Sequence, residues 1–474
     1  MNRMHSSTRL RRFLPAALAL FALALTPLGG CDFTEGFDED PNLATDAPPQ
    51  RVLTAAEVGV VQFQTGDFAR LAGIFGEVFT GSDRQYSRIN TGAINADDFN
   101  NSWNLAYEDV LNELQFAQTL YETEGNEVGA AVAKFHMALT YGQLAALFGD
   151  IPFTDALQGE ENLTPSYTSQ AEAYAGVIQM LDEVIATLSA TDVSVNANAI
   201  GDIFYGGLDV VQPYLEAAQT AKARFCLHLA DFECAYDAAQ NGISDPALNL
   251  EAPFGGNAQS DRNVFYEFVA VQRGGYLTAS NALGVRFLTE GSDRDRTDEF
   301  TDESARRDFY YVGEINNAEL NTSGAFAPAA SAPILTYREN LLILAESALQ
   351  LGLGTDIALD ALNDVRARLQ EIFPEGTYET YPDDFFDSDE ALLEEVLEEY
   401  YLTLIGNIEV YNLVRRTDNA LGLNGRLDGR VPTRFIYGAD EINANPNVPS
   451  PLPGPTDETA VFAGYDYENV GPGV

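Results

Sequence analysis

Apolar residues at helical spacing, grouped into paired segments, constrain this chain more than any other feature. Between residues 107 and 121 they recur every three or four positions, residues 124–126 break the pattern, and a second run extends from Val132 to Leu147. Such spacing puts apolar side chains on one face of an α-helix. The break contains Gly125, which is typical of a turn between helices. The segment therefore predicts a helical hairpin.

Further runs of this kind occupy most of the chain. Ser169 and Glu172 have the spacing of a capping box ahead of an apolar run, and Pro213 suits the first turn of the next helix. Apolar runs resume at 334–351, at 356–370 and from about 389 to 415, where Gly406 interrupts the last one. Helix pairs that recur at roughly 35 to 45 residues are typical of a tetratricopeptide-like stack. We therefore expect a mainly α fold.

The basic N-terminus predicts a lipoprotein signal peptide. Four arginines precede an uncharged, Ala- and Leu-rich run at residues 13–25, which as a helix would span ~20 Å, short of the roughly 30 Å hydrocarbon core of a membrane. The sequence Leu-Gly-Gly-Cys at residues 28–31 resembles a bacterial lipobox, so we expect cleavage before Cys31 and lipidation of that cysteine. Because no other stretch is long and apolar enough to span a bilayer, the lipid is the expected anchor.

Differences in amino-acid composition along the chain predict its division into segments. We expect a signal peptide at 1–30, an acidic tether at 31–50 and a single helical domain at 51–474. Gly, Pro, Ser and Ala are concentrated in two regions of that domain, which favours irregular structure there. The domain is thus expected to comprise helix pairs at 51–243, a loop-rich insert with short strands at 244–332, helix pairs at 333–420 and an irregular tail over the surface at 421–474.

The charge excludes several partners. The 474 residues include 26 Lys and Arg against 72 Asp and Glu, a formal net charge of −46. So anionic a chain repels nucleic acid and cannot dock on anionic lipid through a basic face. Lys134 and Lys222 are its only lysines. Replacing lysine by acid keeps a surface hydrated at high salt, so we expect a halophilic source, the alternatives being an acidic secreted protein or one that collects Ca²⁺.

No motif indicates catalysis or a cofactor. His136 and His228, the histidines left after signal cleavage, fall within expected helices without a second His or Cys at metal-ligand spacing, so we expect helix-core or helix-surface roles. No nucleophile elbow, phosphate loop or dinucleotide fingerprint is present, and acidic pairs are too abundant to single out a glycosidase pair. The run Asp293 to Glu303 has oxygen ligands of the kind Ca²⁺ prefers, but lacks an EF-hand glycine and is interleaved with arginines, which favours a solvated loop. We predict no catalytic residue, metal or cofactor.

Five other positions have both a structural and a functional interpretation. Cys226 and Cys234 could form a disulfide in an oxidising compartment, but we expect two small buried thiols. Arg415 and Arg416 lie at the expected end of a helix, where a cation complements the helix dipole, so we favour structural roles over ligand contact. Trp103 is the sole tryptophan, and its helical phase with Tyr107 favours packing over a sugar platform.

Several blocks, in order, resemble one family. They are residues 133–153, which end in Phe-Gly-Asp-Ile-Pro-Phe, residues 202–207 with 221–225, residues 333–346, and 398–417 with 434–445. In content and order they are similar to the SusD/RagB-like outer-membrane nutrient-binding lipoproteins. Positions 405–411 depart from the family pattern, and the loops at 255–330 match no block.

The resemblance implies a function without catalysis. Such a protein is lipid-anchored at the outer membrane, exposed on the cell surface, and acts as a lid over a SusC-like TonB-dependent transporter, to which it delivers a bound nutrient, often a glycan. The loop-rich insert would face the ligand. From another class, we keep open a surface scaffold or adhesion protein that binds a protein partner, and a glycoside hydrolase. The sequence does not name the ligand.

Two segments have the residues that sugar recognition needs, namely flat aromatic faces beside polar groups on loops. One is residues 82–90 and the other residues 273–281. We expect ligand contacts from them, the alternative being that their tyrosines are half-buried loop anchors. The candidate residues are Arg84, Tyr86, Asn90, Arg273 and Tyr276.

Overall fold

The computed structural model describes residues 47–257 and 261–462. The chain divides into two compact units, residues 1–47 and 48–474, and all but one of the described residues belong to the second. The predicted signal peptide, Cys31 and most of the predicted tether lie outside the described residues. Helix α2 (Pro49–Thr65) begins within the last two residues of that tether.

The predicted hairpin is confirmed. Helices α6 (Asn112–Glu124) and α7 (Glu127–Phe148) pack together, and a π-helical turn (Leu105–Leu111) leads into α6. Gly125 has a φ of +71°, a left-handed conformation that glycine adopts without steric cost. The Asn126 side chain accepts a hydrogen bond from the backbone N–H of Gly129 at 3.0 Å, which caps α7.

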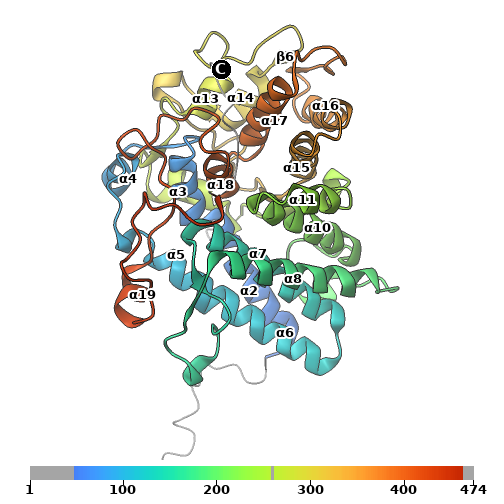
Figure 1. Ribbon diagram of the computed structural model, residues 1–474, viewed down its shortest axis with the longest axis vertical. Coiled ribbons are helices and arrows are strands. Elements are labelled where there is room, and N and C mark those ends of the chain that lie inside the picture. The colour runs from blue at the N-terminus through green and yellow to red at the C-terminus, as the bar shows by residue number, and fades with distance from the viewer. Residues whose placement is uncertain (1–46, 258–260, 463–474) are drawn as a thin grey trace, which may run out of the picture. The chain divides into compact units, whose positions relative to one another are not determined.

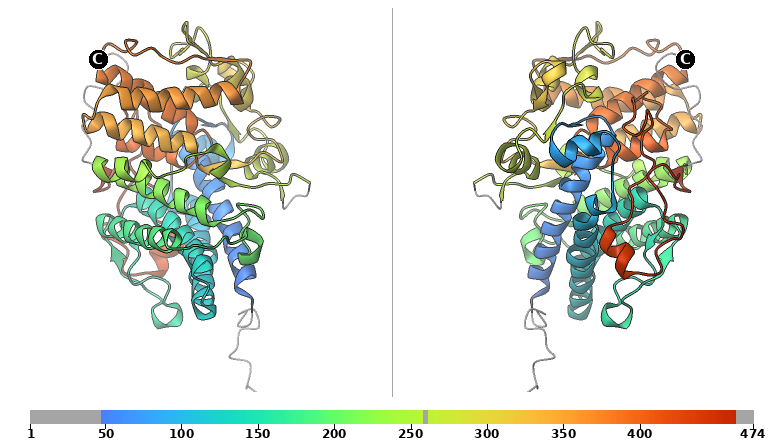
Figure 2. Two further views of the ribbon diagram at one scale, coloured as in Figure 1. Left: turned by 90° about the vertical axis from the view of Figure 1, so that its right-hand side faces the viewer. Right: turned by 90° about the vertical axis from the view of Figure 1, so that its left-hand side faces the viewer.

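The helices form a continuous stack, in which each contacts the next (Figures 1 and 2). After α7 come α8 (Gln170–Ser189), α10 (Val211–His228), α11 (Phe232–Ala239), α15 (Tyr337–Gln350), α16 (Thr355–Ile372) and α17 (Asp389–Thr403). Ser169 caps α8 as predicted, accepting from the N–H of Glu172 at 3.3 Å. Helix α18 (Glu409–Arg416) follows the break at Gly406. The expected mainly α, tetratricopeptide-like stack is confirmed.

Short elements join these helices. The strands pair as β1 (Thr80–Gly81) with β5 (Leu277–Thr278), β2 (Ile151–Pro152) with β3 (Tyr167–Thr168), β4 (Leu250–Ala252) with β9 (Ala332–Leu335), β6 (Thr301–Asp302) with β10 (Thr377–Tyr378), and β7 (Tyr311–Val312) with β8 (Glu319–Leu320). The short helices are α3 (Asp67–Phe75), α4 (Arg84–Asn90), α5 (Asn100–Asn104), α9 (Ala197–Ile200), α12 (Val264–Tyr266), α13 (Leu283–Phe287), α14 (Ser304–Tyr310) and α19 (Ala439–Ala444). The insert therefore has the expected strands and also short helices, whose runs are too brief to show a period.

Residues 421–462, the described part of the C-terminal tail, are largely irregular, as predicted, but they do more than cover the surface. Phe435 is fully buried, and its ring lies 5.5 Å from Phe68 and 4.9 Å from Phe99. Its N–H donates to the carbonyl of Leu147 at 2.8 Å. The Tyr437 hydroxyl donates to the carbonyl of Asp150 at 2.7 Å. The tail thus completes an aromatic core with the first helices.

Arginine–glutamate pairs are buried between helices of the stack. Arg224 reaches Glu339 through two hydrogen bonds, from Nε at 2.6 Å and Nη2 at 2.7 Å. Arg416 is fully buried against Glu346, and Arg415 donates to the carbonyls of Ala146 and Thr433. The structural interpretation of Arg415 and Arg416 therefore agrees with their contacts.

The expectation of two free thiols is wrong. Cys226, on α10, and Cys234, on α11, form a disulfide with a Cα–Cα distance of 5.7 Å. The spacing of eight residues left the pairing open because it depends on the turn between the helices. In the structure this turn brings the two Cα atoms within the range that a disulfide requires.

Within residues 47–257 and 261–462, no helix has both the length and the apolar character needed to cross a bilayer. His136 and His228 are fully buried on α7 and α10, in agreement with the expected core roles.

Candidate binding site

The two segments predicted to contact ligand lie side by side. Strands β1 and β5 pair antiparallel, with Thr80 opposite Thr278. Beyond the pair, the N–H of Ser82 donates to the carbonyl of Tyr276 at 2.8 Å. Positions almost two hundred residues apart in sequence thus form one surface. We call it the β1–β5 surface and define it by Ser82, Asp83, Arg84, Arg273 and Tyr276, which are exposed or half-exposed.

The first segment is a helix, not the expected loop. Asp83 accepts a hydrogen bond from the N–H of Arg84 at 2.8 Å and begins α4. Arg84 has a φ of +52°, which is uncommon for a residue with a Cβ. Its guanidinium lies in solvent beside the Asp83 carboxylate, 3.7 Å away. The seven residues of α4 are too few for an apolar period to reveal them in sequence.

Tyr86 lies beneath this surface and is 4% exposed. Its hydroxyl accepts from Nε of Arg70 at 3.0 Å, and its ring lies 5.2 Å from that of Phe268. Burial, together with the nearby Asp67 carboxylate and against the effect of Arg70, raises the pKa of Tyr86 to about 12. The phenol is therefore neutral. Its placement agrees with the buried-anchor alternative.

The sequence analysis did not single out Arg70, which supports the β1–β5 surface. Its guanidinium stacks on Phe268 at 4.2 Å and pairs with Asp67. It thereby joins α3 to the insert below the β1–β5 surface. No local spacing indicates this contact, because the partners are far apart in the chain.

Asn90 supports the end of β1. Its side-chain oxygen accepts from the N–H of Gly81 at 3.1 Å. Gly81 itself allows a close approach, because a Cβ there would lie 2.0 Å from the carbonyl oxygen of Tyr86. Asn90 is half-buried, and its oxygen is committed to the backbone.

Arg273 and Tyr276 remain accessible. The turn that carries them is closed by a hydrogen bond from the Tyr276 N–H to the Arg273 carbonyl at 3.1 Å. The guanidinium of Arg273 lies 5.8 Å from the centre of the Tyr276 ring. Arg273 is exposed and Tyr276 half-exposed. With Arg84 they offer two accessible cations and one aromatic face to a solute.

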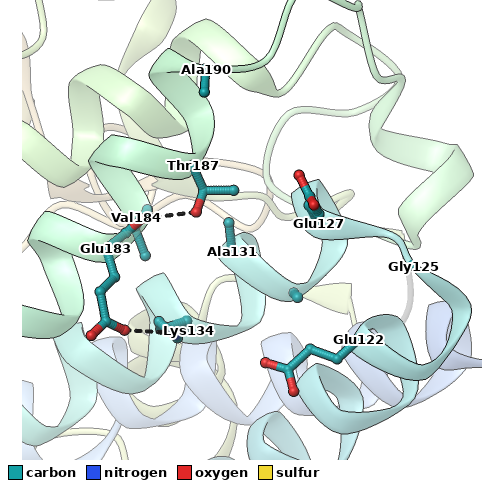
Figure 3. A pocket seen from close by; sticks show the side chains of 10 residues that line it. Glu122, Gly125, Glu127, Ala131, Lys134, Glu183, Val184, Thr187 and Ala190 are labelled. Carbon is teal, nitrogen blue, oxygen red and sulfur yellow. Dashed lines mark hydrogen bonds and ion pairs between the residues drawn. The ribbon is translucent and has the colours of Figure 1, made fainter.

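Hollows lie elsewhere in the part of the chain that the structure describes. One of about 460 Å³ lies between α6, α7 and α8, where Lys134 and Glu183 form an ion pair at 2.7 Å across it (Figure 3). A smaller one, of about 190 Å³, is lined by Trp103 and Tyr107. Trp103 is 3% exposed and packs on Phe148 at 4.9 Å, which agrees with the packing role expected for it.

The acidic run at 293–303 is bound up in internal contacts. Asp293 pairs with Arg286 at 2.7 Å, and Asp295 accepts from the N–H groups of Gly291 and Thr297. Glu303 is buried and contacts Arg296 at 3.0 Å. These contacts agree with the expectation that arginines, interleaved with the acidic residues, pair with them.

Comparison with known proteins relates the chain to one family. Residues 41–270 match the SusD-like family model described as "Starch-binding associating with outer membrane". No curated protein matches the chain. Over these residues the chain is similar to the SusD-like family, in agreement with the resemblance of its sequence blocks.

Solved structures share the fold over most of the chain. A SusD-like protein from Bacteroides thetaiotaomicron has a TM-score of 0.67 at 17% identity, covering 84% of this chain and 93% of that one. A SusD homolog from Bacteroides uniformis gives 0.66 at 18%, covering 87% and 99%. A chitin-binding SusD homolog from Flavobacterium johnsoniae gives 0.62 at 13%, covering 88% and 99%. At these identities the likeness shows the fold.

Proposed function

We propose that this protein binds an oligosaccharide at the cell surface, without turning it over, and delivers it to a SusC-like TonB-dependent transporter as a lid. The observation that carries the proposal is the β1–β5 surface, where an accessible aromatic ring stands beside exposed guanidinium groups. The family description and the chitin-binding structural relatives favour a carbohydrate over other solutes.

The chemistry of the surface suits a sugar. The Tyr276 ring supplies a flat apolar face on which a pyranose stacks, and Arg273 and Arg84 supply several N–H donors for hydroxyl groups. Tyr86 and Asn90 hold this surface from below instead of touching the ligand. The paired strands and the hydrogen bond from the Ser82 N–H to the Tyr276 carbonyl fix the backbone positions from which these side chains extend.

The site is tested by binding assays on paired variants. Calorimetry with chitin and maltose oligosaccharides should show weaker binding by about tenfold for Tyr276→Ala, because one stacking face is lost. Arg273→Ala should also weaken binding. Tyr236→Ala and Arg368→Ala, which remove the same side-chain types from α11 and α16, should leave affinity unchanged. Equal affinity in all four variants would show that the ligand does not bind at the β1–β5 surface.

The lid role rests on the proposed anchor at Cys31, which places the protein at the outer membrane. Gentle detergent extraction followed by affinity purification should recover a large transporter barrel with this chain. Cys31→Ser should release the chain from the membrane fraction. Recovery of a soluble partner without any barrel would favour the scaffold alternative. We retain the division into tether, helical domain and tail as part of the proposal.

A further inference from the structure

Three potential metal ligands meet in the core, and none of them belongs to the β1–β5 surface. Glu57 lies on α2, His136 on α7, and Asp202 just after α9. All three are buried, and one ligand atom from each lies within 4.8 Å of the others. Among the described residues, neither carboxylate has an ion pair with a lysine or arginine.

The hydrogen bonds around this cluster are incomplete. Oε2 of Glu57 accepts from the N–H of Ile203 at 2.8 Å, but Oε1 has no hydrogen-bond partner. Asp202 accepts from the N–H of Tyr205 at 2.9 Å and from the hydroxyl of Tyr214. Because this hydroxyl donates its one proton to Asp202, Nε2 of His136, 2.9 Å away, donates to the hydroxyl oxygen, and an ion bound at Nε2 would displace the Nε2 proton into solvent. An unsatisfied carboxylate oxygen therefore points toward the imidazole.

A cation would compensate this cluster. Glu57 and His136 are fully buried and Asp202 is 4% exposed. Carboxylates at this depth without a positive partner are strongly disfavoured, and a bound metal ion would supply the missing charge.

One of the three ligand spacings matches that of a small tetrahedral ion, and the three ligand atoms lie within 4.8 Å of one another. Nε2 of His136 and Oε1 of Glu57 are 3.4 Å apart, too long for a good hydrogen bond. Metal–ligand distances of about 2.0–2.1 Å place neighbouring ligands of a tetrahedral ion about 3.3–3.4 Å apart. The set of one imidazole and two carboxylates is one that Zn²⁺ accepts.

We propose that Glu57, His136 and Asp202 bind a divalent transition-metal ion of the Zn²⁺ class, as a structural site. The ion ties α2 to α7 and to the segment after α9, and the Tyr214 hydroxyl holds the Asp202 carboxylate in position. Because all three ligands are buried, the ion enters while the chain folds. This site is independent of sugar binding.

Metal content after refolding tests the proposal. The full mature chain is unfolded with EDTA, refolded with ZnSO₄ or with EDTA, desalted, and analysed for zinc by mass spectrometry. We expect about one ion per chain with ZnSO₄, and a higher melting temperature than with EDTA. Glu57→Gln and His136→Leu should lose most of the zinc. His228→Gln, which alters a buried histidine next to a single glutamate, should retain it.

A measurement on the wild-type chain tests the proposal even if the variants fail to fold. Refolding with CoCl₂ should give the intense visible absorption of four-coordinate Co²⁺, and ZnSO₄ should abolish it. A wild-type chain that retains neither metal and melts at the same temperature with ZnSO₄ and EDTA would show that the two carboxylates share a proton instead. Zinc retained equally by the Glu57 and His136 variants would also overturn the proposal.

Discussion

Individual buried charges in this protein are stabilised by oppositely charged partners. The guanidinium of Arg224 is fully buried and meets both oxygens of Glu339, with a further hydrogen bond to the carbonyl of Ile334 at 2.6 Å. Such a pair holds its position because each ion would be far less stable alone in the core. The few lysines of this chain, by contrast, pair near the surface.

Glu339→Gln should lower the free energy of unfolding by about 3–5 kcal/mol, because it leaves the Arg224 charge uncompensated in the core. Urea unfolding followed by circular dichroism measures the change. Glu183→Gln breaks the more exposed pair with Lys134 and should cost no more than about 1 kcal/mol. Equal effects of the two variants would contradict this account.

Buried His228 gives stability a pH dependence. Burial lowers its pKa in the folded protein, although Glu409, 2.6 Å from Nε2, opposes the shift. Below an ordinary histidine pKa of about 6.5, His228 is therefore protonated in the unfolded chain but not in the folded one. The free energy of unfolding consequently falls as pH falls.

Below about pH 6.5 the stability attributable to His228 should fall with pH, by no more than about 1.4 kcal/mol per pH unit, which is the limit for one proton. Urea unfolding at several pH values, in wild type and His228→Gln, isolates it, because the contribution of His136 is common to both. The variant should show a shallower dependence. Parallel curves would mean that His228 is protonated in the folded protein.

At the scale of elements, the close packing of helices depends on small residues. Gly142 of α7 lies against α10, and a Cβ at this position would come within 2.2 Å of the Phe225 ring. Alanine is the better helix former, so an isolated helix would gain from it. In the stack, steric overlap outweighs that gain.

Gly142→Ala should therefore destabilise the protein by about 1–3 kcal/mol despite the better helix propensity. Thermal unfolding measures the effect. Adding Phe225→Leu removes part of the ring, and the double variant should lose less than the two single losses combined. Strict additivity would show that the two helices do not meet there.

The same scale shows how far sequence reasoning reaches. The pairs α6–α7 and α15–α16 were predictable because apolar spacing and the breaks between them are local signals. Helix α4 and the stacking of Arg70 on Phe268 were not, since one is too short and the other joins distant segments. The two candidate segments were found by composition, but their pairing through β1 and β5 and the burial of Tyr86 required the fold.

For the whole molecule, charge dominates the response to solvent. Loss of the predicted signal peptide removes four arginines and no acid, which takes the net charge from −46 to −50. Repulsion among so many carboxylates destabilises the compact state, and salt screens it, with a Debye length falling from about 10 Å at 0.1 M to about 3 Å at 1 M.

The melting temperature should accordingly rise by several degrees or more between about 0.05 M and 1 M NaCl, with most of the rise at the low end where screening changes fastest. Differential scanning calorimetry measures it. Sucrose at the same osmolality stabilises by exclusion alone and is the control. No rise with NaCl beyond that of sucrose would show that the surface carboxylates do not repel one another appreciably.

The return of the tail into the first helices changes how this stack must be made. In an open array of repeats, early units can settle while later ones are still being synthesised. Here Phe435 fills a space between Phe68 and Phe99, so an incomplete chain leaves those rings uncovered. We therefore expect the N-terminal helices to reach their final packing only after residue 435 has been synthesised.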